Sequence, residues 1–169
     1  MTWHELPFGD FVFLDGDGRE SGSLQYRALA LPGAPPAFAK EMPAGEVHSV
    51  ALQFFDPETG GRLLVAPDVA GANEDLLKAL GDSDAVLFDG TFWSNDELSK
   101  LKPAARTADQ MGHITIERSL ELLRGSRAKK KAYIHINNTN PILAAESKAR
   151  AAVEGSGIEV ARDGMEFEL

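Results

Sequence analysis

The stretch AYIHINNTNP, residues 132–141, joins an apolar run to a histidine and then to several amides. Tyr133 and Ile134 carry the aromatic and β-branched side chains that favour a strand, and His135 follows them directly. We therefore predict a buried strand over residues 132–136 that presents His135 as it leaves the sheet. The residues that follow are typical of a loop and include three amides, Asn137, Asn138 and Asn140.

Two further apolar runs end on a polar residue in the same way. RLLVAPD, residues 62–68, delivers Asp68, and AVLFD, residues 85–89, delivers Asp89. Ligands of open α/β sheets bind beyond the carboxyl ends of the strands, so this repetition indicates a site. Aspartate also favours turns whatever the function, and NNTNP also fits a loop held by side-chain-to-backbone hydrogen bonds. Structural roles therefore stay open for each residue alone.

The other patterns complete a layered α/β fold in one domain. Further strands are predicted over residues 24–31, 47–55, 62–66 and 85–88, helices over 73–80, 116–125 and 146–155, and a closing hairpin over 158–169 that turns on Asp163-Gly164. Strands cluster first and strand–helix units follow. That order favours helices packed on a sheet, in an α/β or α+β arrangement.

The composition excludes several classes of function. The net charge is −9, which disfavours nucleic acid or an anionic membrane as a partner. The sequence contains no cysteine, which rules out disulfides, thiolate zinc sites, iron–sulfur clusters and a cysteine nucleophile, and which fits a cytoplasmic location. No apolar run approaches the roughly 20 residues that span a bilayer, so we expect no membrane insertion.

A fourth candidate, His113 in QMGHITIE, precedes the predicted start of a helix. A helix amino terminus disfavours added positive charge, so we expect His113 to stay neutral, as a metal ligand or a proton acceptor must. Together, His113, His135 and the two aspartates form a nitrogen and oxygen set suited to zinc or iron(II). The amides after His135 are expected to orient its ring or to contact a ligand. The remaining histidines, His4 and His48, have no such motif beside them. We assign structural or surface roles to both.

Four motifs carry a resemblance to a known family: LFDGTFWSNDEL (87–98), QMGHITI (110–116), YIHINNTNPIL (133–143) and GIEVARDGMEFEL (157–169). Their order and spacing resemble the carboxyl-terminal half of the pyrroloquinoline quinone (PQQ) synthesis protein B family, of the metallo-β-lactamase superfamily. Weaker similarity through ALPGAPPAF (30–38) and VHSVALQFF (47–55) extends it over the whole chain. The resemblance implies one partial domain over residues 1–169: half of an αββα sandwich, with a mixed sheet and helices on one face.

The resemblance also implies roles for individual residues. Asp68 lies where the superfamily has a metal-bridging aspartate, and His135 matches its last histidine ligand. His113 resembles the glycine–histidine element of related phosphodiesterases, which serves acid–base catalysis or positioning, and Asp89 lies where an acid supports that histidine. A divalent metal, iron(II) or zinc, is thus expected on Asp68, His113 and His135. The histidine- and aspartate-rich loop of the superfamily's first half has no counterpart here, so we expect a truncated or split second half.

Three functions follow as hypotheses. The first follows from family membership, which implies metal-dependent hydroxylation of a tyrosine-derived or dipeptide precursor of PQQ, with Asn137 and Asn138 binding the substrate. The family also suggests carriage of PQQ or its precursor. The second hypothesis is a zinc hydrolase of the wider superfamily. The third is a non-catalytic half-domain. A half sandwich leaves a sheet face uncovered, which favours a homo-oligomer or pairing with a separate first half.

Overall fold

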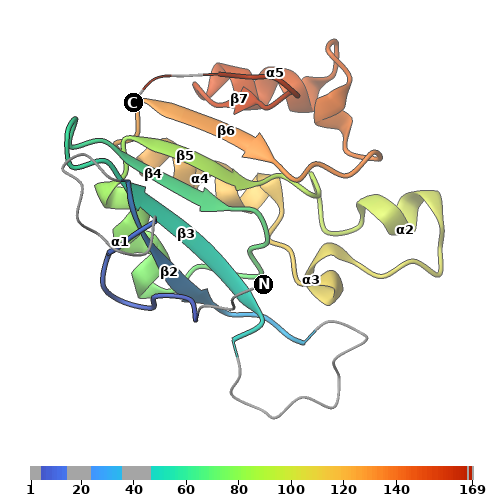
Figure 1. Cartoon of the computed structure of the whole chain (residues 1–169). Coiled ribbons are helices and arrows are strands. Elements are labelled where there is room, and N and C mark those ends of the chain that lie inside the picture. The colour runs from blue at the N-terminus through green and yellow to red at the C-terminus, as the bar shows by residue number, and fades with distance from the viewer. Residues whose placement is uncertain (1–4, 15–23, 36–46, 167, 169) are drawn as a thin grey trace.

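The computed structural model describes residues 5–14, 24–35, 47–166 and 168 of the 169-residue chain. These residues form a seven-stranded sheet in which the strands lie side by side in chain order (Figure 1). The strands are β1 (Val12–Phe13), β2 (Gln25–Leu31), β3 (Ser49–Phe55), β4 (Arg62–Ala66), β5 (Ala85–Asp89), β6 (Lys130–Ile134) and β7 (Glu159–Val160). Neighbours from β1 to β4 pair antiparallel, and neighbours from β4 to β7 pair in parallel. The predicted mixed α/β sheet is confirmed.

Helices occur mainly in the connections between the parallel strands, as parallel pairing requires. They are α1 (Glu74–Asp82), α2 (Glu97–Leu101), α3 (Ala108–Met111), α4 (Ile116–Gly125) and α5 (Lys148–Gly155), with a 3-10 turn, η2, at Pro141–Leu143. Asn73 caps α1 by accepting a hydrogen bond from the Leu76 N–H. Within the described part of the chain, none of these helices has the length and apolar character needed to cross a membrane.

Three sequence predictions differ from the structure. β6 ends at Ile134 instead of residue 136, because His135 adopts a left-handed backbone conformation with φ of 54° and leaves the sheet. α1 continues through Gly81 to Asp82. The closing hairpin is wrong as far as it is described: Gly164 lies in a turn, but β7 pairs in parallel with β6, and no antiparallel partner is found within residues 158–166.

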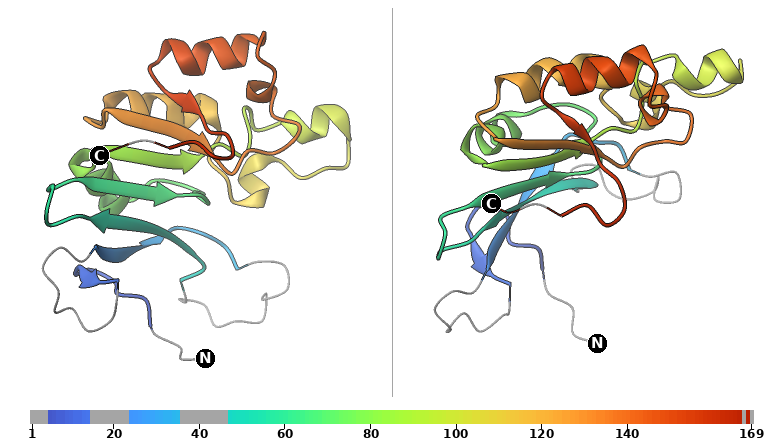
Figure 2. Two further views of the ribbon diagram at one scale, coloured as in Figure 1. Left: turned by 45° about the horizontal axis from the view of Figure 1, so that its top comes forward. Right: turned by 90° about the horizontal axis from the view of Figure 1, so that it is seen from above.

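The two faces of the sheet differ in their packing. One face packs its alternate apolar side chains against α1, α4 and α5, which lie on the same side of the sheet in the right view of Figure 2. This core includes Leu64, Phe88 and Tyr133 from the strands. The opposite face presents apolar residues that stay half-buried, among them Val50, Leu52, Leu63, Val65 and Leu87. Burial is therefore deepest on the helix side.

Parallel pairing brings the carboxyl ends of β4, β5 and β6 to one edge of the sheet. Ala66 lies beside Phe88, and Asp89 lies beside Ile134. Gly90 allows β5 and β6 to stay close at this edge, because a Cβ there would lie 2.8 Å from the Tyr133 Cβ and 3.0 Å from the Ile134 carbonyl oxygen. The segments that follow the three strands therefore start together, at the end of the sheet near which α2 and α3 lie (Figure 1).

Candidate metal centre

Asp89 is the central group of this edge and is completely buried. Its Oδ1 accepts hydrogen bonds from the Thr91 N–H (2.9 Å) and the Thr91 hydroxyl (2.6 Å). Its Oδ2 accepts from the Val69 N–H (3.0 Å) and lies 2.8 Å from His113 Nδ1. A buried carboxylate that accepts bonds at both oxygens has its charge well satisfied. Asp89 is therefore placed to orient its neighbours.

The hydrogen bond between Asp89 and His113 determines which ring nitrogen of His113 is free. An ionised carboxylate only accepts, so His113 Nδ1 carries the proton and Nε2 keeps its lone pair. Nε2 has no hydrogen bond among the described residues, and no buried side-chain nitrogen or oxygen among them lacks a partner. His113 also lines a cavity. Nε2 therefore opens to that cavity, as a metal ligand would.

The Thr91 hydroxyl determines in the same way which ring nitrogen of His135 carries the proton. It lies 2.6 Å from Asp89 Oδ1, 3.0 Å from His135 Nδ1 and 2.9 Å from the His135 carbonyl oxygen. Its single hydrogen goes to the charged acceptor at the shortest distance, so His135 Nδ1–H donates to the Thr91 oxygen. His135 then also keeps its lone pair on Nε2. One buried carboxylate thus determines the tautomer of both histidines.

Asp68 lies beside this pair. Its Oδ2 accepts a hydrogen bond from the Ser49 hydroxyl (3.2 Å), and its Oδ1 lies 3.6 Å from His113 Nδ1. The Asp68 side chain is 47% exposed, so this carboxylate faces the cavity. The His113 and His135 rings lie 5.5 Å apart between centroids. Among the described residues, Asp89, His113 and His135 form a group whose ligand atoms all lie within 4.8 Å of one another, and Asp68, which was predicted as a ligand, is not part of this group.

The acids around His113 control its charge. Burial disfavours the imidazolium, but the hydrogen bond from Asp89 and the charges of Asp89 and Asp68 outweigh burial and raise the pKa of His113 above 6.5. This direction is opposite to the one expected from the amino terminus of the next helix. α4 begins three residues after His113, at Ile116, whereas Asp89 is in direct contact with the ring.

The backbone of His135 is strained where it leaves the sheet. His135 is the one non-glycine residue with a positive φ among those described. Such a conformation costs free energy and persists where the surroundings hold it. Here the Gly90 N–H donates to the Ile134 carbonyl oxygen (2.8 Å), and the Asn137 N–H donates to the Thr91 carbonyl oxygen (3.2 Å). The turn after β5 therefore holds both the backbone and the ring of His135.

The cavity next to these groups has a volume of about 720 Å³. Loops after β2, β4 and β6 and the segment around α3 line it, with Gly33, Ser49, Asp68, Arg106, His113 and His135 among the lining residues. His48 also lines the cavity, although the sequence around His48 does not indicate such a position. Neither Asn137 nor Asn138 is among the described lining residues. Their predicted contact with substrate stays a prediction.

The amides after His135 hold the loop that follows β6. The Asn137 side-chain N–H donates to Thr139 Oγ1 (2.7 Å), and Asn140 is buried and donates to the carbonyl oxygen of Gly90 (2.8 Å). Thr91, which orients His135, was missed by the sequence reasoning. Its position two residues after Asp89 fits a local turn in which an aspartate accepts from the backbone, and that was the available signal.

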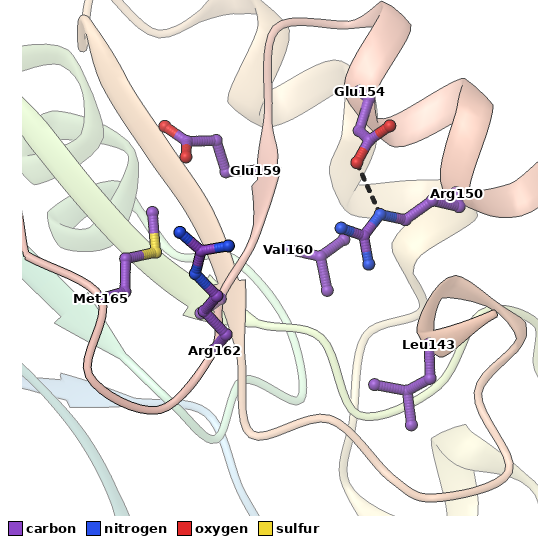
Figure 3. Close-up of a pocket in the computed structure, with 8 residues that line it drawn as sticks. Leu143, Arg150, Glu154, Glu159, Val160, Arg162 and Met165 are labelled. Atoms are coloured by element: carbon purple, nitrogen blue, oxygen red, sulfur yellow. Dashed lines mark hydrogen bonds and ion pairs between the residues drawn. The ribbon is translucent and has the colours of Figure 1, made fainter. Parts of the chain in front are cut away.

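A second hollow, of about 440 Å³, lies beside α5 and β7. Figure 3 shows Arg150 joined to Glu154 and, on the other side of the hollow, Arg162 near Met165. The Arg150–Glu154 ion pair measures 2.6 Å. The residues that line this hollow include no histidine. The paired imidazoles belong to the cavity at the strand ends, so that cavity is the candidate metal centre.

Residues 1–136 match the family model described as a Beta-lactamase superfamily domain. The chain belongs to the β-lactamase superfamily. A protein named Coenzyme PQQ synthesis protein B from Pseudomonas entomophila (strain L48) is 39% identical to it over the whole chain and 56% of the relative's length. The same-named protein from Pseudomonas putida (strain GB-1) is 40% identical over the same shares. The chain therefore spans about half the length of the curated relatives it matches, and the resemblance predicted from the four motifs is confirmed.

Solved structures agree with this assignment. A crystal structure of Zn(2+)-bound PqqB from Methylobacterium extorquens superimposes with a TM-score of 0.77 and 30% identity, over 86% of this chain and 50% of that one. The metallo-β-lactamase fold protein YhfI from Bacillus subtilis gives a TM-score of 0.56 at 11% identity, over 86% of this chain and 50% of that one. The second likeness shows the fold alone. The predicted metallo-β-lactamase-like fold is confirmed.

Proposed function

We propose that this chain provides the divalent metal centre of a PQQ synthesis protein B-type enzyme that oxidises a tyrosine-derived precursor of PQQ. The observation that carries the proposal is the pair of histidines whose Nε2 lone pairs are freed by one buried carboxylate, next to a cavity. Similarity to Coenzyme PQQ synthesis protein B over the whole chain supports the pathway.

The residues present fit a divalent cation. His113 and His135 would bind it through Nε2 and Asp68 through Oδ1, which is a nitrogen and oxygen donor set without thiolate. When bound, iron(II) supplies the redox chemistry that oxidation by dioxygen requires, whereas zinc supplies Lewis-acid activation of water. The zinc in the Methylobacterium extorquens protein supports a metal of this class here.

Asp89 and His113 would act as a proton-handling pair. The hydrogen bond at 2.8 Å and the nearby charge of Asp68 stabilise a proton on His113, which a general acid in this position needs. This role is an alternative to metal binding by His113: in it, His135 and Asp68 alone would hold the ion, and His113 would face the substrate. Thr91 and Ser49 hold the side chains of His135 and Asp68 towards the cavity.

The test is anaerobic loading with iron(II), followed by oxygen, a glutamate–tyrosine dipeptide and ascorbate, which supplies the two electrons that reduce the second oxygen atom to water, with mass spectrometry of the product. The proposal expects a product with one added oxygen atom, and its loss in His135→Gln. Absence of any hydroxylated product, even with a protein that supplies the first half of the fold, would remove the proposal. Tight binding of the dipeptide without turnover would favour carriage of the precursor instead.

A zinc hydrolase is the second candidate, and one observation favours it. The half-exposed Asp68 carboxylate lies next to His113, where it could bridge two ions. Zinc stoichiometry and turnover of a generic phosphodiester separate the two candidates. Two zinc ions per chain with phosphodiester turnover would favour the hydrolase, whereas one ion without turnover would exclude it.

We also propose that the face of the sheet opposite the helices pairs with a second sheet. Its apolar residues, such as Leu52 and Val65, are only half-buried although they occupy the middle strands. The chain spans about half the length of its relatives, which supports either a separate first half or a second copy as the partner. Sedimentation tests this proposal, and a well-behaved monomer at high concentration would contradict self-pairing.

A further inference from the structure

The cavity at the candidate metal centre has walls of different charge. The residues that line it include the acid Asp68 with His113 and His135, and also Arg106 and Gln110 from the segment before and within α3. Among the described residues that line the cavity, Arg106 is the one whose side chain is cationic at every physiological pH. It is exposed to solvent. A ligand that reaches from the centre to this wall therefore meets a guanidinium.

The two acids among the described residues that line this cavity, Asp68 and Asp109, already have partners. Asp109 also lines the cavity, but its Oδ1 forms an ion pair of 2.8 Å with Arg118, which lies on α4. Asp68 lies against His113 and accepts from Ser49. No ion pair or hydrogen bond of the Arg106 side chain occurs within the described parts of the chain. With respect to the described residues, its charge is therefore available to a ligand.

The backbone on both sides of Arg106 is held in place. The Ala105 N–H donates to the Lys102 carbonyl oxygen (2.8 Å), and the Ala108 N–H donates to the Asn95 carbonyl oxygen (3.0 Å). Thr107 forms a capping box with Gln110 at the start of α3. α3 then rises by about 6 Å over its four residues and leads directly to His113. Arg106 and His113 are thus two ends of one short, hydrogen-bonded segment.

We propose that Arg106 is a specificity-determining residue that binds a carboxylate of the substrate while the reacting group lies at the metal centre. The proposal rests on the proposed function, since it assigns the substrate's orientation in the same cavity. A guanidinium binds a carboxylate through two parallel hydrogen bonds, which a lysine ammonium does not reproduce. Arg106 therefore selects a substrate that carries a carboxylate, and under the proposed function this carboxylate lies apart from the reacting ring.

The experiment compares two probes that differ in one group, 3-(4-hydroxyphenyl)propanoate with its charged carboxylate and the corresponding neutral primary amide. Isothermal titration measures the Kd of each for the zinc-loaded chain. The ratio of the two Kd values isolates the contribution of the carboxylate. In the unmodified chain we expect the acid to bind about tenfold more tightly than the amide, which corresponds to about 1.4 kcal/mol.

Three variants decide where the preference for the acid comes from. Arg106→Gln is expected to reduce the ratio to about one, and Arg106→Lys to retain part of it. Arg162→Gln removes the same charge from the second hollow shown in Figure 3 and is expected to leave the ratio unchanged. Thermal melts confirm that each variant is folded. Because Arg106 is exposed, we expect no loss of stability.

The outcomes separate this inference from the proposed function. If the unmodified chain shows no preference for the acid, or if Arg106→Gln keeps the full preference, the inference is overturned, and in the second case the metal itself binds the carboxylate. If the preference disappears in Arg106→Gln while no hydroxylated product forms from the dipeptide, the inference stands and the oxidase proposal fails.

Discussion

Replacing Thr91 by valine tests the link between Asp89 and His135. Valine keeps the shape of the side chain but has no hydroxyl, so the contacts at 2.6 Å to Asp89 Oδ1 and 3.0 Å to His135 Nδ1 are lost together. The Thr91 backbone N–H still donates to Asp89 Oδ1, so the carboxylate keeps a donor at each oxygen. His135, in contrast, loses the group that sets its tautomer.

The size of both effects follows from these contacts. Thr91 is 7% exposed, so the lost bond to a charged carboxylate is not replaced by bulk water. A hydrogen bond to a charged group contributes about 1.5–3 kcal/mol, and we expect Thr91→Val to lower the free energy of unfolding by about 2 kcal/mol. Removing a group that orients a metal-binding histidine reduces metal affinity by about 10- to 100-fold, and the same loss is expected for zinc here.

The assay measures zinc affinity by competition with a chromophoric chelator and stability by urea unfolding of the metal-free chain. Thr139→Val is the matched control: Thr139, in the loop after β6, donates to Glu97 Oε1 (2.6 Å), and none of its hydrogen bonds among the described residues involves a candidate histidine ligand. It should lose stability and keep its zinc affinity. Thr91→Ser should restore both properties. If Thr91→Val bound zinc as tightly as the unmodified chain, the proposed orientation of His135 would be refuted.

Three further predictions concern the same edge of the sheet. The pKa of His113 is raised above 6.5, so its contribution to the stability of the metal-free chain is complete below about pH 6.5 and is lost as the pH rises through the folded pKa. Urea unfolding across this range should show that loss of stability. His113→Gln should remove this part of the pH dependence. Gly90→Ala should destabilise the fold by about 1–3 kcal/mol and lower Tm in circular dichroism, because the new Cβ would meet Tyr133 at 2.8 Å; an unchanged Tm would contradict the close approach of β5 and β6. Asn140→Ala should cost about 1–3 kcal/mol in urea unfolding by removing the buried bonds to Gly90 O and the Ile142 N–H, and a neutral result would show that the amide holds nothing in place.

The strand ends were predictable because they depend on local pattern and on a general property of parallel sheets. Apolar runs followed by Asp68, Asp89 and His135 gave the three positions, and parallel pairing of β4, β5 and β6 brought them to one edge. His113 was found by its glycine and by the family resemblance. The helix and strand bounds were mostly right within a few residues, since caps and apolar periodicity determine them locally.

What the sequence could not predict depends on contacts between distant residues. Thr91 and His135 are 44 positions apart, and nothing in either motif indicates that one hydroxyl joins them. The charge of His113 was predicted in the wrong direction because a helix terminus is visible in a sequence, whereas the contact with Asp89 is not. Arg106 follows no motif and is recognised as a cavity residue only in the folded chain.

The most direct test of this metal centre is nitrogen NMR of the histidine rings during a zinc titration. With His113 and His135 assigned by single substitutions, we predict that both rings carry their proton on Nδ1 and that both Nε2 signals shift when one equivalent of zinc is added. A proton found on Nε2 of either ring, or a signal that stays in place at saturating zinc, would show that these two histidines do not share the metal.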